Sequence, residues 1–269
     1  MLKNEGDILK KVIVCTPRLE YFKIDNLDAH NISQLPDRDK TIHQHDVLKS
    51  ILEKSGCKVI DVVELRNHPN SVFVGDTAIC TPKGYIKLRM GLESRRGEEE
   101  WMAEVLESVG ESNAGSIKKP GTVEGGDVIL AGSIAFVGYS SRTNIDGIKQ
   151  ISNLLKDMDY EIRTVKIPPP FLHLGGTMSV ISKQCVLYCK DIFPRGFFKG
   201  FDKIDIPNSS FISGNVISLG NDRVIVESSN VEVAEKLEDQ GFTVYNIDLS
   251  EFIRGRGGPS CLILPVERR

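Results

Sequence analysis

The chain has 269 residues, of which 40% are hydrophobic and 26% charged, and its formal net charge is -3. This composition is typical of a folded globular protein and excludes the disordered and fibrous classes. Nucleic acid is disfavoured as a partner because phosphate backbones select for clustered excess Lys and Arg. No segment reaches the roughly 20 apolar residues of a membrane span, and the first residues lack the apolar run of a signal peptide. We therefore expect a cytoplasmic protein, without a membrane partner, that acts on a small molecule.

The predicted elements are mostly short strands that alternate with amphipathic helices. Branched and aromatic residues favour strands at KVIVC (11–15), KVIDVV (58–63), SVFV (71–74), TAIC (77–80), YIKLR (85–89), DVIL (127–130), IAFVGY (134–139), MSVIS (178–182), CVLYC (185–189), NVISL (215–219), RVIVE (223–227) and FTVYNI (242–247). Apolar residues spaced three and four apart favour helices over 39–55, 95–110, 143–157 and 230–240. The pattern predicts an α/β fold.

A glycine-containing strand opening recurs five times, roughly 40 to 50 residues apart, at VGDTAIC, EGGDVILAG, LGGTMSVIS, SGNVISLG and GGPSCLILP. Four of these openings begin a predicted hairpin, and the fifth strand, SCLILP, can pair with KVIVC near the N-terminus and close a ring. We therefore expect one domain over residues 1–269, built as a propeller-like ring of five α/β units with a site at its axis. A pair of ordinary α+β domains is the alternative.

Chemically useful side chains stand at the same five openings. They are Asp76, Glu124 with Asp127, His173, Asn215 and Cys261. The ring would bring two carboxylates, a histidine and a cysteine together, with Asp127 in a supporting role.

Cys261 differs in its surroundings from the other five cysteines, Cys15, Cys57, Cys80, Cys185 and Cys189, which are expected to be reduced, ordinary apolar residues. It follows a Gly-Gly-Pro-Ser stretch, where backbone N–H groups can face a developing charge. A thiolate needs a base or a positive charge nearby, and His173 is a candidate. Carboxylates beside a thiolate raise its pKa, so they favour a cationic substrate, and a guanidinium group matches carboxylates well.

At these residues the sequence resembles the dimethylarginine dimethylaminohydrolase family of the guanidine-modifying, or pentein, superfamily. The resemblance is carried in order along the chain by NSVFVGD (70–76), ESRRGE (93–98), PGTVEGGD (120–127), SRTN (141–144), LHLGG (172–176) and GGPSC (257–261). It implies a five-bladed α/β propeller and hydrolysis of arginine or an N-substituted arginine to citrulline or another ureido product. No cofactor or metal is implied, and a homodimer is left open.

The resemblance also implies a role for each site residue. Catalysis would fall to Cys261 as nucleophile, His173 as acid and then base, and Glu124, while substrate would be bound by Asp76, Asn70, Arg95 and Arg142. Asp76 and Glu124 would hold the guanidinium nitrogens, and the two arginines would hold an α-carboxylate.

Five positions depart from the patterns of the superfamily and bear on the substrate. Asn70 and Gly75 stand where the family typically has acidic residues, which weighs against methylated arginine. Gly175 replaces the second acid of an HxD motif, which weighs against plain arginine deiminase. Arg256, like Arg254, adds positive charge before the nucleophile, and would either lower the pKa of Cys261 or bind a second acidic group of the substrate.

Two other segments invite functional readings. Residues 19–39 lack periodicity and lie where the family has a mobile loop over the pocket, so they are either a lid or a plain surface loop. His43, His45 and Asp46 form no predicted metal site, because residues two apart on a helix diverge. The alternatives for the whole chain are an amidinotransferase, an arginine deiminase, and a non-enzymatic binding protein of the same fold.

Overall fold

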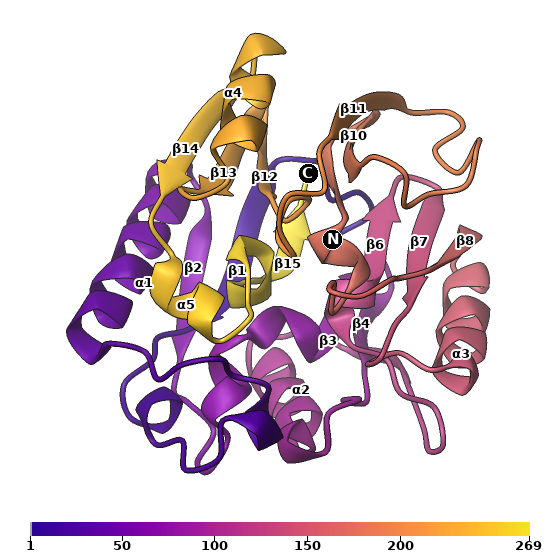
Figure 1. The fold of residues 1–269 in the computed structure, drawn as a ribbon. Coiled ribbons are helices and arrows are strands. Elements are labelled where there is room, and N and C mark those ends of the chain that lie inside the picture. Colours follow the sequence, from indigo (N-terminus) through magenta and orange to yellow (C-terminus); the bar gives the residue numbers. More distant parts are fainter. Residues whose placement is uncertain (1) are drawn as a thin grey trace.

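The computed structural model describes residues 2–269, which form five three-stranded sheets arranged around a common axis (Figure 1). In each sheet two antiparallel strands are followed by a third that lies parallel to the middle one. The sheets are β15 (Leu264–Arg268), β1 (Leu9–Cys15) and β2 (Lys58–Val62); β3 (Ala78–Thr81), β4 (Gly84–Lys87) and β5 (Asn113–Ser116); β6 (Val128–Ala131), β7 (Ile134–Tyr139) and β8 (Glu161–Lys166); β9 (Met178–Ser182), β10 (Cys185–Cys189) and β11 (Asp202–Ile206); β12 (Ile217–Gly220), β13 (Arg223–Glu227) and β14 (Thr243–Ile247).

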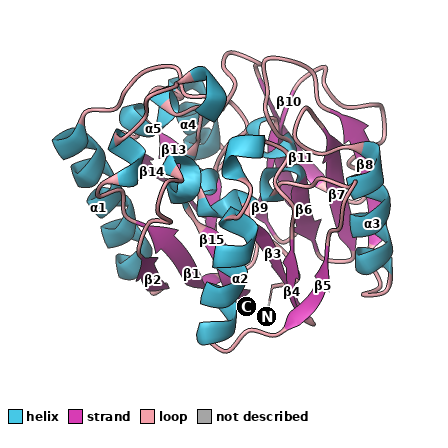
Figure 2. Ribbon diagram, turned by 90° about the horizontal axis from the view of Figure 1, so that it is seen from below, coloured by secondary structure: helices cyan, strands magenta, loops and turns pink. Residues whose placement is uncertain are grey.

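Pairing between the two ends of the chain closes the ring. β15 runs antiparallel to β1, with Leu264 opposite Ile13 and Pro265 opposite Val12. The first strand, β1, accordingly lies beside the last, β15, and Figure 2 shows the ring from below. The predicted five-unit α/β propeller and its closure by the last strand are confirmed, while the extent of the domain over 1–269 stays a prediction.

Four helices lie at the periphery, each between the second and third strand of a sheet (Figure 1). They are α1 (Arg38–Lys54), α2 (Glu98–Ser108), α3 (Ile145–Lys156) and α4 (Val231–Asp239), all close to their predicted positions. A side chain caps two of them: Asp37 accepts a bond from the N–H of Lys40, and Asn144 from that of Gly147. A short helix before Cys261, α5 (Ser250–Arg254), was not predicted.

In the fourth sheet an aromatic loop takes the place of a helix. Residues 190–201 connect β10 to β11 without a helix. The loop buries Phe197 and Phe198, whose rings lie 5.3 and 5.6 Å from that of Phe136 on β7. Phe136 belongs to the third sheet, and the ring of Phe198 also lies 4.9 Å from that of Tyr188 on β10, so the loop packs against both the third and the fourth sheet.

The predicted strand at SVFV is wrong. Residues of this segment form two 3-10 turns, η3 (Pro69–Val72) and η4 (Val74–Asp76), although every residue from 69 to 74 is buried. The segment is apolar because its turns are buried. A short apolar run in the sequence does not distinguish a strand from a buried turn. Similarly, SCLILP begins as the 3-10 turn η8 (Pro259–Leu262) and becomes a strand only at Leu264.

The glycine openings form turns that meet at the axis. η4, η6 (Gly125–Asp127), η7 (Leu174–Gly176) and η8 precede β3, β6, β9 and β15, and neighbouring turns contact one another. A Cβ at Gly125 would lie 2.1 Å from the carbonyl oxygen of Gly75, so a side chain there would force the turns apart. This close approach gathers the polar residues of distant segments into one site.

A cavity of about 800 Å³, counting its open mouth, lies on the axis along the inner strands. Its walls are mainly apolar, with Glu5 and Arg268 among them. No helix within residues 2–269 is both long enough and apolar enough to cross a membrane.

Candidate active site

A smaller cavity of about 320 Å³, counting its open mouth, holds most of the predicted site residues. Six of the seven line it: Cys261, His173, Asp76, Arg95, Arg142 and Asn70. The seventh, Glu124, is fully buried and reaches the cavity through its bond to His173. Residues separated by up to 191 positions in the sequence are thereby brought to one place.

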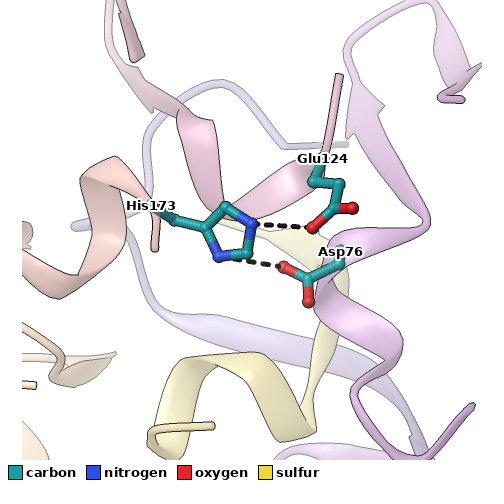
Figure 3. A group of neighbouring side chains, drawn as sticks. All are labelled: Asp76, Glu124 and His173. Atoms are coloured by element: carbon teal, nitrogen blue, oxygen red, sulfur yellow. Dashed lines mark hydrogen bonds and ion pairs between the residues drawn. The ribbon is translucent and has the colours of Figure 1, made fainter. Parts of the chain in front are cut away.

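The ring of His173 faces two carboxylates, those of Glu124 and Asp76 (Figure 3). Its Nε2 is 2.8 Å from Oε2 of Glu124, and its Nδ1 is 3.8 Å from Oδ1 of Asp76. Burial opposes a charge on the ring, but Asp76 and the bond to Glu124 outweigh it and raise the pKa of His173 to about 9. The ring packs against Gly126, where a Cβ would lie 2.8 Å from its Cγ. At neutral pH His173 is therefore an imidazolium, which can donate a proton.

Glu124 is held as a carboxylate despite complete burial. Its Oε1 accepts bonds from the N–H groups of Gly91 and Leu92, at 2.9 and 3.2 Å. Burial alone would raise its pKa, but the bond and charge of His173, with further help from two arginines, hold the pKa well below its usual range. A buried anion of this kind can bind a cation or orient an acid.

Cys261 is a thiol in the free protein. Burial, followed by the charge of Asp76, raises its pKa to about 12, against the opposing effects of a backbone bond to Gly258, of Arg95 and of Asn215. Asn215 also fixes the turn, because its Oδ1 accepts a bond from the N–H of Ser260 at 2.9 Å. The thiol is thus held in place by the turn but stays protonated until positive charge arrives beside it.

Arg95 lines the cavity and is at the same time bonded to several protein groups. It is 3% exposed, and its Nη1 lies 2.7 Å from Oδ2 of Asp76. Its Nε and Nη2 donate to Oε2 of Glu98 at 2.9 and 2.7 Å, and Nη2 also donates to the carbonyl of Phe73. The geometry makes Arg95 the residue that orients Asp76. Glu98 was missed by the sequence analysis, although its position three residues after Arg95 at a helix start is a usable signal.

Arg142 and Asn70, the other predicted binding residues, have polar groups with few protein partners. Nη1 of Arg142 approaches Oε1 of Glu124 at 3.5 Å, and no bond from its guanidinium to a residue in 2–269 is closer. Asn70 donates from Nδ2 to the carbonyl of His30 at 3.1 Å, while its buried Oδ1 has no partner among the described residues. Both side chains therefore offer groups to a ligand.

The two arginines before the nucleophile differ in placement. Arg254 points away, with Nη1 3.2 Å from Oε2 of Glu251, and does not line the cavity. Arg256 lines it, and its Nη1 donates to Oδ1 of Asn31 at 3.3 Å. The positive charge that lowers the pKa of Cys261 comes instead from Arg95.

Asp127 supports the site without lining the cavity. Its Oδ1 accepts the N–H of Leu174 at 2.9 Å and its Oδ2 accepts the hydroxyl of Ser140 at 2.6 Å. Burial raises its pKa to about 6. Its bond to Leu174 fixes the backbone next to His173, as expected of a supporting residue.

The segment predicted as a lid or plain loop forms part of the cavity wall. It contains the 3-10 turns η1 (Glu20–Phe22) and η2 (Asp28–His30), and its residues His30 and Asn31 line the cavity. Tyr21 anchors the segment, since its fully buried ring stacks on Phe252. Whether the segment moves stays a prediction.

Potential metal ligands occur in two places, on α1 and in the cavity. His43 is exposed and His45 is buried on α1, with Nδ1 of His45 bonded to Thr16, so the two imidazoles diverge as expected. Single ligand atoms of Asp76, Glu124 and His173 do lie within 4.8 Å of one another. Those atoms are already paired with each other and with Arg95, and the arginine charge beside them disfavours a metal cation. A planar guanidinium, which donates hydrogen bonds, suits the carboxylates better.

Comparison with known proteins gives a consistent result. A sequence profile described as "N,N dimethylarginine dimethylhydrolase, eukaryotic" matches residues 23–268. The chain is 30% identical to the N(G),N(G)-dimethylarginine dimethylaminohydrolase of Pseudomonas aeruginosa, over 96% of this chain and 99% of that protein. It is 32% identical to an uncharacterised protein of Aeropyrum pernix, over 83% of each. The Pseudomonas aeruginosa enzyme in complex with citrulline superposes with a TM-score of 0.84 at 28% identity, covering 96% of this chain and 99% of that one.

Five sheets around an axis, with Cys261, His173 and two carboxylates at its centre, define a guanidine-modifying enzyme of the pentein fold. Within that class, the matching profile and the identity to its relatives place the chain in one family. It belongs to the dimethylarginine dimethylaminohydrolase family.

Proposed function

We propose that this protein is a cysteine hydrolase that cleaves a C–N bond in the guanidino group of arginine or an N-substituted arginine. The observation that carries the proposal is the position of His173, bonded to Glu124 and facing Asp76, in the cavity that Cys261 lines. The family's amidine hydrolases support it. The products would be ammonia or an amine and citrulline or another ureido compound.

The first half of the reaction uses His173 as an acid. A substrate guanidinium held by Asp76 and Glu124 brings positive charge to the sulfur, so the Cys261 thiol releases its proton to solvent and becomes a thiolate. The thiolate attacks the central carbon and forms a C–S bond. His173, with its pKa of about 9, gives its proton to the departing nitrogen as the C–N bond breaks. A covalent thiouronium and a free amine result.

The second half uses the now neutral His173 as a base. It takes a proton from water, whose oxygen adds to the thiouronium carbon. The C–S bond then breaks, the thiolate is released, and the ureido product leaves. The net reaction consumes one water for each guanidino group, and no redox partner is needed.

A screen of guanidino compounds tests the proposal. Wild-type protein would be incubated with arginine, methylated arginines, hydroxyarginine and agmatine, and the ureido product measured, with Cys261→Ser as the control. We expect the wild type to form ureido product from at least one compound and the variant to form none. Absence of product with every compound would refute the proposal. Adding glycine or lysine as an acceptor would reveal an amidinotransferase, because the amidino group would then appear on the acceptor.

A further inference from the structure

We propose that the axial cavity, which Glu5 and Arg268 line, is a second binding site that takes a small monocarboxylate with an apolar chain and holds its carboxylate on Arg268. Arg268 does not line the substrate cavity, so the site goes beyond the proposed hydrolase activity and does not depend on it. The axial cavity measures about 800 Å³, counting its open mouth. Protein interiors rarely hold voids larger than a water molecule, so a cavity of this size indicates an occupant.

The walls of the axial cavity are apolar along most of its length. The first strand of every sheet contributes to them, and apolar walls offer few hydrogen bonds to water. An apolar chain is therefore the favoured occupant of this part of the cavity. The apolar lining includes Ile79 of β3, Leu130 of β6, Val180 of β9, Ile217 of β12 and Leu264 of β15.

Arg268 supplies a polar end to this apolar cavity. It is the last residue of β15, whereas Cys261 precedes that strand, so the two stand at opposite ends of the cavity. Arg268 is 5% exposed, and its Nη1 donates to the carbonyls of Asp7 and Ser218 at 2.7 and 2.9 Å. Its buried Nε has no hydrogen-bond partner among residues 2–269, and its Nη2 donates no bond to them either. Nε and Nη2 form the edge of a guanidinium that donates two parallel bonds to a carboxylate.

The charge of Arg268 has no bonded carboxylate in the described part of the chain. Burial lowers the pKa of Arg268 to about 10, against the opposing charge of Glu5, so the residue remains a cation at neutral pH. Glu5 lines the same cavity, but its Oε1 accepts the N–H of Leu130 at 3.2 Å and it makes no direct ion pair with Arg268. A buried cation without a bonded anion is costly, so a ligand carboxylate would be stabilised at Arg268.

Glu5 leaves room for a ligand anion because its own charge is easily lost. Burial, against the charge of Arg268 and the bond from Leu130, raises the pKa of Glu5 to about 7. Near neutral pH a large share of the molecules therefore carries an uncharged Glu5, which does not repel a carboxylate. A dianion would meet only one arginine, so a monocarboxylate matches the charge of the site better.

The other ionisable groups near Arg268 leave its open edge unoccupied. The carboxylate of Asp7 faces Nζ of Lys183 at 3.8 Å. Burial raises the pKa of Cys57 to about 11 and that of Tyr160 to about 12, so both are uncharged at neutral pH. Arg268 and Glu5 therefore decide the charge that a ligand meets.

The test is isothermal titration calorimetry of the whole protein with hexanoate and hexanol, which share one chain and differ in the head group. We expect hexanoate to bind at least about tenfold more tightly than hexanol. Arg268→Gln should weaken hexanoate binding by roughly tenfold and leave hexanol binding within about twofold. Glu5→Gln should tighten hexanoate binding by about three- to tenfold just above the pKa of Glu5, because the competing charge is removed. A gain of affinity cannot come from a damaged fold, so E5Q keeps the test decisive if R268Q folds poorly.

Arg256→Gln is the control for the rival location, because Arg256 lines the substrate cavity and could attract a carboxylate there. Hexanoate binding should be unchanged in R256Q, and its loss in that variant would overturn the inference. Equal affinities for hexanoate and hexanol, or an unchanged hexanoate affinity in E5Q, would overturn it as well. So would the absence of hexanoate binding to the wild type below about 10 mM.

Discussion

Asp76 is held by Arg95 through a 2.7 Å ion pair, and the other side of that arginine is bound by Glu98 at the start of α2. The carboxylate that faces His173 is therefore oriented by a buried chain of charges that runs into a helix. The pKa of Arg95 lies above its usual value because Glu98 and Asp76, in that order, outweigh the cost of burial. Disturbing Glu98 should therefore affect both stability and catalysis.

Replacing Glu98 by Ala should lower the free energy of unfolding by about 3 kcal/mol, because it leaves part of a buried cation unpaired. Urea unfolding measures this loss. The matched control is Glu93→Ala, a truncation of an exposed glutamate in the neighbouring turn, which should stay within about 0.5 kcal/mol of wild type. A small loss in E98A would mean that Glu98 contributes little to holding Arg95.

Cys261 should alkylate slowly at neutral pH and faster as the pH rises. With a pKa of about 12 in the free protein, its thiolate fraction should grow about tenfold for each pH unit between pH 7 and 10, without a plateau. Iodoacetamide labelling followed by mass spectrometry measures the rate. Cys261→Ser supplies the background from Cys185, which is half-buried and has a pKa raised to about 11 by burial. A plateau below pH 8 would contradict the assigned state of the thiol.

Restoring an acidic residue should cost more stability at position 75, where the new side chain meets backbone, than at position 70, where it loses the bond that Nδ2 of Asn70 donates to the carbonyl of His30. A Cβ at Gly75 would lie 2.8 Å from the carbonyl oxygens of both Ser260 and Ile263. We expect Gly75→Glu to destabilise the protein by about 1–3 kcal/mol or more. Asn70→Asp keeps the shape of its side chain and serves as the control. Equal melting temperatures for G75E and wild type would show that the backbone of the turn accommodates the side chain easily.

Turnover should not depend on a divalent metal. Asp76, Glu124 and His173 are close enough to share an ion, but their charges are already paired with Arg95, Arg142 and each other. Dialysis against EDTA should therefore leave kcat unchanged, with an untreated sample as control. A loss that added Zn²⁺ or Mg²⁺ restores would require a different mechanism.

The glycine openings made much of the site predictable from sequence. Each opening repeats at a fixed place in its unit, so Asp76, His173 and Cys261 could be assigned to one axis before any geometry was known. The family motifs then supplied roles that spacing alone does not give. The strand prediction failed at SVFV (71–74), because the apolar residues of a buried turn give the same sequence pattern as those of a buried strand.

Contacts between distant side chains could not be predicted. Arg256 and Asn31 are separated by 225 positions, and neither a repeat nor a motif links them. The motif assigned Arg95 to the substrate, which stays a prediction, but it could not show the protein partners of Arg95, because a motif records which residue is present and not what it contacts. Its pairing with Asp76 and Glu98 depends on how η4 packs against α2, which only the folded chain fixes.

The most direct test of the central claim is to trap the covalent intermediate on Cys261. His173→Ala would be mixed with S-methyl-L-thiocitrulline, whose methanethiol leaves without acid assistance, and analysed by intact mass and peptide mapping. We expect one thiouronium adduct per chain on Cys261, and the adduct should persist because the variant lacks the base that activates water. The double variant, which carries both His173→Ala and Cys261→Ser, should form no adduct. An adduct on another residue, or turnover that survives loss of the Cys261 sulfur, would contradict the account.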